Sequence, residues 1–112
     1  MKLATLAIDG WELESGEAIH REKPHTFELP PLHERSNLQN GAIVKLIFHF
    51  RIVDASGQES LEIERMWVIV HGRVGEFYRG ILDNDPDCTD EIKAGLEVWF
   101  RPEHVIQIWR EQ

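Results

Sequence analysis

The sequence predicts a small α+β domain that is mostly β, built as a strongly bent antiparallel sheet or partly open barrel with one or two short N-terminal helices. Apolar residues alternate after residue 42, which predicts strands because every second side chain of a strand faces the same side. Turn-forming residues at 54–57 and 72–75 separate these strands and predict hairpins. Before residue 41, prolines and capping residues divide the chain into short pieces.

The length of 112 residues predicts a single domain over 1–112, with a helical N-terminal extension at 1–41 and a β-rich core at 42–112. Apolar residues make up 42% of the chain and charged residues 29%, which is the balance of an ordinary globular domain. The single cysteine, Cys88, excludes an internal disulfide and a cysteine-based zinc site within one chain. We therefore expect a reducing, cytoplasmic location.

The balance of charge bears on the choice of partner. The 20 acidic residues against 12 basic ones give a net charge of −8, which opposes binding to nucleic-acid phosphates and to anionic membranes. A basic protein partner is compatible with this charge, because opposite charges steer association. The longest apolar run, Met66–Val70, is far shorter than the roughly 20 residues that span a bilayer. We expect no contact with a membrane.

The N-terminal extension is predicted to form short elements. Residues 2–8 alternate weakly and are predicted as a short strand or an ordered arm. A helix is predicted over 15–23, because Ser15 can cap its first turn and Pro24 ends it. A second helix is predicted over 32–38. The sequence leaves open whether this extension packs on its own core or on a neighbouring chain.

The β-rich core is predicted to contain five strands. The longest alternation places apolar side chains on one face of a strand over 42–53. The next strand, over 59–71, ends in a continuous apolar run, which predicts that both of its faces are covered there. A short helical turn is predicted over 90–94. The remaining strands are predicted over 76–82, 96–100 and 105–109.

Four blocks of the chain, taken in order, carry a resemblance. They are Asn37, Leu38, Gly41 and Val44–Phe48; Glu64–Val68; Gly80, Leu82, Asn84 and Pro86; and Lys93, Gly95, Val98, Phe100, Glu103, His104 and Ile106. Their order and spacing resemble a bacterial domain family of unknown function with a Met-Trp-Val strand, an Asn-x-Pro turn and a Gly-x-x-Val hairpin. The resemblance covers about residues 11–109 and implies a small domain without an established activity or catalytic residues. Leu96 stands where that pattern has an acidic residue.

The acidic turn after the third predicted strand is the first candidate site. Its alternating aspartates begin like a calcium-binding loop, but the pattern fails at Cys88 and Ala94, where it requires Gly and Glu. Turns and helix N-termini favour the same residue types for structural reasons. We expect no metal ion here and interpret the turn as a candidate interaction surface. Its residues are Asp83, Asp85, Asp87, Asp90 and Glu91.

A polar strand site formed by His49, His71 and Arg65 is the second candidate. The two histidines lie on neighbouring predicted strands, and we expect them to face each other across the hairpin. Two adjacent imidazoles can bind zinc, respond to pH or act in a hydrolase. The plainer alternative is that both are exposed strand residues. The 6 histidines match no usual metal-binding spacing.

Aromatic residues interleaved with arginines on the predicted strands are the third candidate, because small barrels bind single-stranded nucleic acid in this way. The alternative is that Trp67 and Trp99 are core residues and that the arginines pair with glutamates across strands. Acids alternate with bases along these strands, which favours the alternative. The chain carries no phosphate-binding Gly-rich loop and no Gly-x-Ser-x-Gly motif, so we predict no cofactor and no catalytic residue.

The leading hypothesis from the sequence is a non-enzymatic interaction module that binds another protein through its acidic surface or a sheet edge. A module that neutralises a basic toxin or nuclease is one concrete form of it. A hydrolase or metal-binding protein using the strand histidines, and a single-stranded nucleic-acid binder using the strand aromatics, are the alternatives. The sequence determines neither the identity of a partner nor the oligomeric state.

Overall fold

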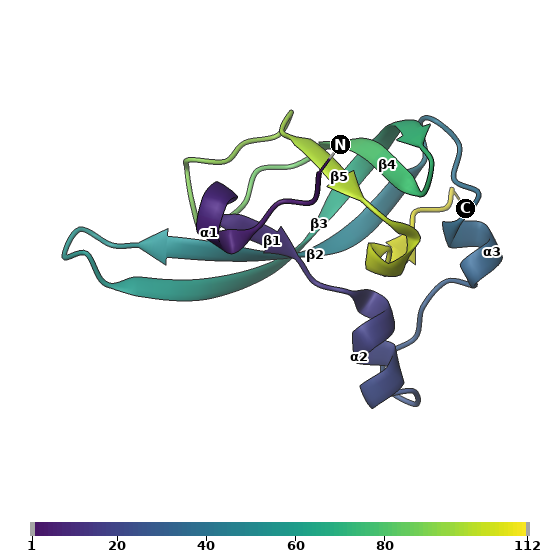
Figure 1. Cartoon of the computed structure of the whole chain (residues 1–112), viewed down its shortest axis with the longest axis horizontal. Coiled ribbons are helices and arrows are strands. Elements are labelled where there is room, and N and C mark those ends of the chain that lie inside the picture. Colours follow the sequence, from purple (N-terminus) through teal and green to yellow (C-terminus); the bar gives the residue numbers. More distant parts are fainter. Residues whose placement is uncertain (1, 112) are drawn as a thin grey trace.

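The chain forms a six-stranded antiparallel sheet that curls into a half-barrel (Figure 1). The computed structural model describes residues 2–111. The strand order is β1-β2-β3-β4-β5, and β6 pairs with β2 further along the edge that β1 also uses. The strands are β1 Trp11–Leu13, β2 Ile43–Val53, β3 Glu59–Val74, β4 Phe77–Leu82, β5 Glu97–Phe100 and β6 Gln107–Ile108. The predicted small, mostly β domain with a strongly bent sheet is confirmed.

β2 and β3 form a long hairpin whose far end projects from the molecule, to the left in Figure 1. We call residues 51–61 of this hairpin the arm. Its turn is closed by Asp54, whose carboxylate accepts hydrogen bonds from the amides of Ser56 and Gln58 at 2.9 and 3.0 Å. Gly57 completes the turn with a φ of 86°, a backbone conformation that glycine adopts without a steric penalty. The predicted hairpin at this turn is confirmed.

The core lies on the inner, concave face of the half-barrel, where alternate residues of each strand are buried. β4 approaches β3 closely because position 80 is a glycine. A Cβ on Gly80 would lie 2.4 Å from Cγ1 of Val68 and 3.0 Å from Cε1 of Phe100. The largest fully buried side chains are Tyr78, Phe48, Phe50, Phe100, Leu46, Met66, Leu82, Val44, Val68, Val70, Val98 and Val105.

The chain starts with a helical turn, α1 (Leu6–Asp9). The hydroxyl of Thr5 caps it by accepting a hydrogen bond from the amide of Ile8 at 3.4 Å. Gly10, with a φ of 78°, ends it in the left-handed region. The strand predicted over 2–8 is therefore wrong, because a capping hydroxyl and a terminal glycine enclose a segment whose alternation was weak.

β1 packs the N-terminal extension onto its own chain, which answers a question that the sequence leaves open. It pairs with β2 so that Trp11 lies opposite Phe50. Trp11 is 7% exposed, and its ring centroid lies 5.5 Å from that of Phe48. The sequence pattern did not predict this strand, because it is only 3 residues long. β1 covers part of the edge of β2 that faces away from β3, and Trp11 adds an aromatic ring to the core.

Two further helices, α2 (Gly16–Glu22) and α3 (Leu32–Arg35), follow β1. Ser15 caps α2 as predicted, since its hydroxyl accepts a backbone hydrogen bond at 3.2 Å. α3 ends before its predicted end at 38, because the amide of Leu38 donates to the hydroxyl of Tyr78 at 3.2 Å instead of extending the helix. Within residues 2–111, none of the helices has the length and apolar character needed to cross a membrane.

The C-terminal part is less regular than the sequence predicts. The helical turn predicted over 90–94 is wrong, because the amide of Ala94 donates to the carboxylate of Asp85 at 2.8 Å and closes the loop on itself. A 3-10 helix, η1 (Pro102–His104), follows β5. It lies between the two last predicted strands, and the final strand shrinks from the predicted 105–109 to the two residues of β6.

Candidate interaction surface

The acidic turn belongs to the loop between β4 and β5, and β3 positions its start. The amide of Asp83 donates to the carbonyl of Trp67 at 3.0 Å. The amide of Trp67 in turn donates to the side-chain oxygen of Asn84 at 3.1 Å. Further along, Ile92 lines a hollow together with Ile52 of β2, so the loop crosses the inner face at the base of the arm. The loop is therefore packed against the sheet and held there by hydrogen bonds to β3.

Glu64 of β3 anchors the middle of this loop. Its carboxylate accepts hydrogen bonds from the amides of Asp87 at 3.0 Å and Cys88 at 2.9 Å. Partial burial opposes ionisation, but these hydrogen bonds lower the pKa of Glu64 below its ordinary value. Burial, followed by the hydrogen bond and the charge of Glu64, raises the pKa of Cys88 to about 12. The thiol is therefore protonated near neutral pH and is a poor nucleophile.

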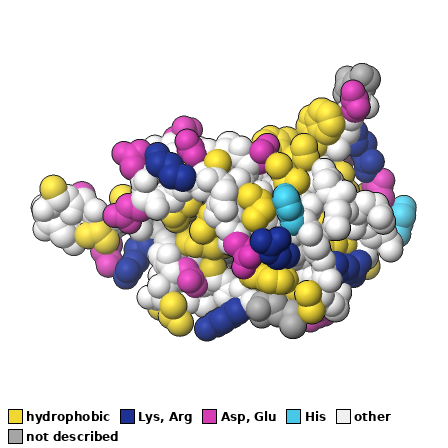
Figure 2. All heavy atoms as spheres, turned by 90° about the horizontal axis from the view of Figure 1, so that it is seen from above, with side chains coloured by type: hydrophobic (Ala, Val, Ile, Leu, Met, Phe, Trp, Pro, Cys, Tyr) yellow, Lys and Arg dark blue, Asp and Glu magenta, His cyan; other side chains and the backbone are white. Residues whose placement is uncertain are grey.

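The five acidic side chains of the turn are all exposed: Asp83, Asp85, Asp87, Asp90 and Glu91. Glu62 and Glu64 of β3 adjoin them, since Glu64 binds the loop and the charge of Glu62 acts on Cys88. We call these seven residues the acidic surface. Lys93 lies 3.5 Å from Asp90, but both groups are exposed, and such pairs are weak. Figure 2 shows acidic side chains spread over the arm and the neighbouring half of the molecule.

The two histidines of the predicted polar strand site do not meet. His49 lies opposite Ile63 in the β2–β3 register. His71 is exposed at the bulge of β3, and the same register carries it past the first residue of β2. The expectation that His49 and His71 face each other is therefore wrong. The turn at 54–57 sets the register, and a pairing of positions 49 and 71 would require a loop of a different length.

His49 and Arg65 each have another partner. Nε2 of His49 lies 2.6 Å from Oε2 of Glu14, which precedes α2. The guanidinium of Arg65 lies over the ring of Phe27, 5.7 Å from its centroid. Across the described residues, 2–111, no group of three or more His, Cys, Asp or Glu side chains is arranged to hold a metal ion. This region thus contains a pair between His49 and Glu14 and a cation–π contact between Arg65 and Phe27.

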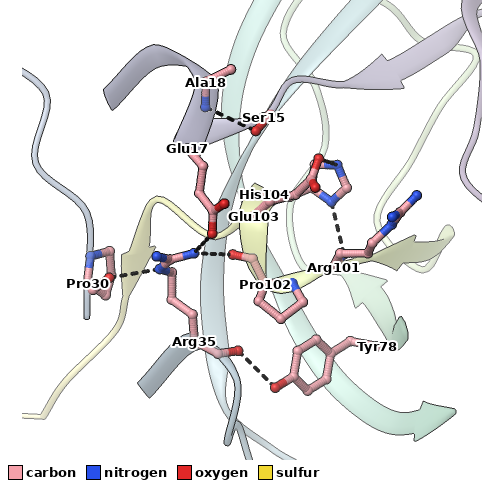
Figure 3. Close-up of polar contacts among 10 residues, drawn as sticks. All are labelled: Ser15, Glu17, Ala18, Pro30, Arg35, Tyr78, Arg101, Pro102, Glu103 and His104. Atoms are coloured by element: carbon pink, nitrogen blue, oxygen red, sulfur yellow. Dashed lines mark hydrogen bonds and ion pairs between the residues drawn. The ribbon is translucent and has the colours of Figure 1, made fainter. Parts of the chain in front are cut away.

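A buried polar cluster, which sequence reasoning missed, connects the helices to the sheet (Figure 3). Arg35 is 6% exposed, and its guanidinium donates to the carbonyls of Pro30 at 2.8 Å and Pro102 at 2.9 Å. It also pairs with the carboxylate of Glu17 at 2.6 Å. The hydroxyl of Tyr78 donates to the carbonyl of Arg35 at 2.8 Å. A lone arginine in a short helix usually lies on the surface, so its sequence context held no signal of this role.

His104 is the second buried polar residue next to this cluster (Figure 3). It is 3% exposed, and its Nδ1 accepts a hydrogen bond from the amide of Arg101 at 2.9 Å. Burial, together with the charge of Arg101, lowers the pKa of His104 to about 4, although Glu17 opposes this shift. The imidazole is therefore neutral near neutral pH. Its hydrogen bond to the backbone gives it a structural role in η1.

The strand aromatics contribute mainly to the core. The rings of Phe48, Phe50, Tyr78 and Phe100 are buried. Trp67 and Trp99 are half-buried and not core residues, which corrects the sequence-based interpretation. Lys45 lies over Trp67 at 4.6 Å from the ring centroid, and the indole of Trp99 donates to Glu97 at 2.9 Å. The predicted cross-strand pairing of arginines with glutamates is confirmed for Arg79 and Glu97, 2.7 Å apart. Buried rings cannot stack on nucleic-acid bases.

Comparisons with family models, with curated proteins and with solved structures find no match for this chain. The resemblance to a bacterial domain family therefore stays a prediction.

Proposed function

We propose that the protein is a non-enzymatic interaction module whose acidic surface binds a basic protein partner. The observation that supports this most directly is that Asp87 and Glu91 stand exposed on a loop that other side chains hold in place. Glu64 and Asn84 fasten the loop to β3. Within residues 2–111, the carboxylates of Asp87 and Glu91 make no hydrogen bond or ion pair. These charges are therefore available to a partner without loss of the fold.

The grouping of like charges favours a basic partner. Opposite charges accelerate encounter and select the orientation of two proteins, and both effects weaken as salt rises. A basic toxin or a nuclease is a concrete form of such a partner, because proteins that contact nucleic acids do so largely through Lys and Arg. An acidic module covering those side chains would inhibit the partner.

The test compares two double variants that remove the same charge from different places. Asp87→Asn with Glu91→Gln neutralises the turn, whereas Glu22→Gln with Glu28→Gln neutralises two exposed acids near α2. Each protein is purified gently from its own cells at low salt and examined by native mass spectrometry. We expect the wild type and the α2 variant to carry a stoichiometric basic protein, and the turn variant to lose it.

Salt dependence completes this test. The isolated complex is titrated with salt while partner binding is followed by fluorescence anisotropy. We expect affinity to fall at least tenfold when the ionic strength rises from about 0.1 M to about 0.5 M, because the screening length falls below the spacing of most surface charges. A partner that stays bound at high salt, or that both double variants release equally, contradicts the proposal.

A further inference from the structure

One edge of β3 is open along the arm. β2 pairs with β3 along the full length of the hairpin, from Ile43 opposite Ile69 to Val53 opposite Glu59. On the other side of β3, pairing with β4 begins only at Val68. The edge of residues 59–65 therefore has no neighbouring strand in the described part of the chain. In Figure 1, β3 forms the lower border of the arm.

The backbone groups on this open edge belong to the odd-numbered residues. Val70, an even position, bonds toward β2: its amide donates to the carbonyl of Ala42, and its carbonyl accepts from the amide of Gly41. Trp67, an odd position, bonds away from β2, to Asp83 and to the side chain of Asn84. Amides and carbonyls alternate between the two edges of a strand. The odd positions from 59 to 65 thus present their amides and carbonyls to the open edge.

The side chains of the same positions share the outer face of the hairpin. Leu61 is 52% exposed and Ile63 is 57% exposed, so two large apolar side chains at successive odd positions of β3 are open to solvent. Glu59 and Arg65 flank them and are also exposed. Arg65 is held on the outer face by Phe27, 5.7 Å from the ring centroid to the guanidinium carbon. Along the outer face, the edge therefore reads acid, apolar, apolar, base.

This order is complementary to itself. In an antiparallel pairing of two copies about a two-fold axis at Glu62, position 59 lies opposite position 65, and position 61 opposite position 63. Glu59 then meets Arg65 of the second copy, and Leu61 meets Ile63 of the second copy. Each of these pairs joins odd positions, whose backbone groups point toward the partner, so each is a hydrogen-bonded pair. The backbone hydrogen bonds, the apolar contact and the ion pair therefore all favour the same register.

We propose that the protein forms a weak symmetric dimer in which the open edges of two β3 strands pair antiparallel and join the two sheets into one. The pairing uses the same edge in both copies, so it stops at two chains. Residues 59–65 form a small interface, which places it in the class of weak and transient contacts. Glu62, on the inner face, meets its own copy at the axis, and this like-charge contact limits affinity. The acids of the turn, residues 83–91, lie outside the paired segment, whereas Glu62 belongs both to the acidic surface and to the dimer axis.

The charge order supplies a decisive test by analytical ultracentrifugation of the full chain, at concentrations up to about 100 µM. The wild type is expected to show a reversible monomer–dimer equilibrium. Glu59→Arg alone and Arg65→Glu alone each place like charges opposite each other twice, and each is expected to raise the dissociation constant roughly tenfold. The double variant with both changes restores opposite charges and is expected to return within about threefold of the wild type.

Two more variants probe the apolar pair and the axis. Leu61→Lys is expected to weaken the dimer at least tenfold, whereas Leu32→Lys, which changes a similarly exposed apolar residue on α3, is expected to leave it unchanged. Glu62→Gln removes the like-charge contact and is expected to strengthen the dimer about threefold. All these side chains lie at exposed positions. Circular dichroism confirms for each variant that the fold is retained.

A chain that stays monomeric over the whole concentration range overturns the proposal. A double charge reversal that is as weak as the single ones overturns the register, because only the two-fold pairing places position 59 opposite position 65. The Asp87→Asn, Glu91→Gln variant separates this dimer from the acidic-surface function. It is expected to lose a basic partner and to keep the dimer, so either proposal can fail without the other.

Discussion

At the scale of single residues, burial and nearby charges set the protonation of Cys88 and His104. Cys88 has its pKa raised by burial and by Glu64, which comes from another strand. His104 has its pKa lowered by burial and by the nearby charge of Arg101. The acidic residues around Cys88 in the sequence predict a raised pKa, whereas nothing in the sequence next to His104 marks that residue as perturbed. Both shifts favour the neutral form of the side chain near neutral pH.

The pKa of His104 makes stability depend on pH. Its pKa falls from the ordinary 6.5 to about 4 in the folded state, so the folded protein binds this proton less tightly than the unfolded chain. The contribution to the free energy of unfolding is complete above pH 6.5 and is lost as the pH falls toward 4, by up to about 3 kcal/mol. Urea unfolding at about pH 7 and about pH 4.5 measures this fall.

The variant His104→Asn should reduce the loss in the free energy of unfolding between about pH 7 and about pH 4.5. Asn can accept the hydrogen bond of the Arg101 amide and does not titrate. His25→Asn removes an exposed imidazole and serves as the control, which should keep the wild-type pH dependence. If His104→Asn loses stability on acidification as steeply as the wild type, another group controls the acid sensitivity.

At the scale of elements, β3 organises the molecule. Its even-numbered residues contribute Met66, Val68 and Val70 to the core. Its edge holds the start of the acidic loop through Trp67, and its side chain Glu64 holds the middle. At its N-terminal end, over residues 59–65, the same strand has an open edge. One strand thus serves the core, the acidic surface and the proposed dimer contact at successive positions.

Gly80 tests how tightly β4 packs on β3. A Cβ there would lie 2.4 Å from Val68 and 3.3 Å from the carbonyl oxygen of Ile69, so Gly80→Ala must displace core atoms. We expect a loss of about 2–3 kcal/mol in the free energy of unfolding. Gly72→Ala is the matched control, since nothing lies within 4 Å of its Cβ position, and should cost less than about 1 kcal/mol. Urea unfolding measures both variants. Equal losses in the free energy of unfolding for Gly80→Ala and Gly72→Ala would contradict this account of the packing.

At the scale of the whole molecule, the N-terminal extension and the β core fold as one unit. β1 pairs with β2, and Trp11 joins the core. Arg35 ties α3 to α2 through Glu17 and to η1 through the carbonyl of Pro102. Tyr78 of β4 binds the backbone of Arg35 from the other side. These contacts link segments from the two ends and the middle of the chain.

Arg35→Ala should weaken this unit. The substitution leaves two part-buried carbonyls without their donor, whereas Glu17 is 34% exposed at its side chain and keeps access to water. We expect a loss of about 3 kcal/mol in the free energy of unfolding. Arg51→Ala removes an arginine that is 46% exposed and pairs with Glu59 at 3.4 Å, and should cost less than about 0.5 kcal/mol. Denaturant unfolding measures the loss in the free energy of unfolding for each variant. Similar losses for Arg35→Ala and Arg51→Ala would mean that water replaces the hydrogen bonds of Arg35 at no cost.

Much of the fold follows from local patterns. The prediction placed strands over 42–53, 59–71 and 76–82, and the structure has them at 43–53, 59–74 and 77–82. Long alternation of apolar residues is a strong signal, since it reports which side chains face the core. α1 and β1 were missed because elements of 4 and 3 residues are too short to show a period. The helical turn over 90–94 was wrong, because Asp85 supplied a side-chain acceptor for the amide of Ala94.

The candidate sites divide in the same way. The acids of the turn are exposed, as their density in a turn suggested, whereas His49 and His71 lie far apart along the hairpin. The sequence by itself determined the bent antiparallel sheet, the charge of −8 and the alternation along β3, because these depend on residue type and local period. The tertiary structure decided the burial of Arg35 and His104, the anchoring of the acidic loop by Glu64 and the open edge of β3. Those features depend on which distant segments meet, and in this chain that is set by strand register and packing.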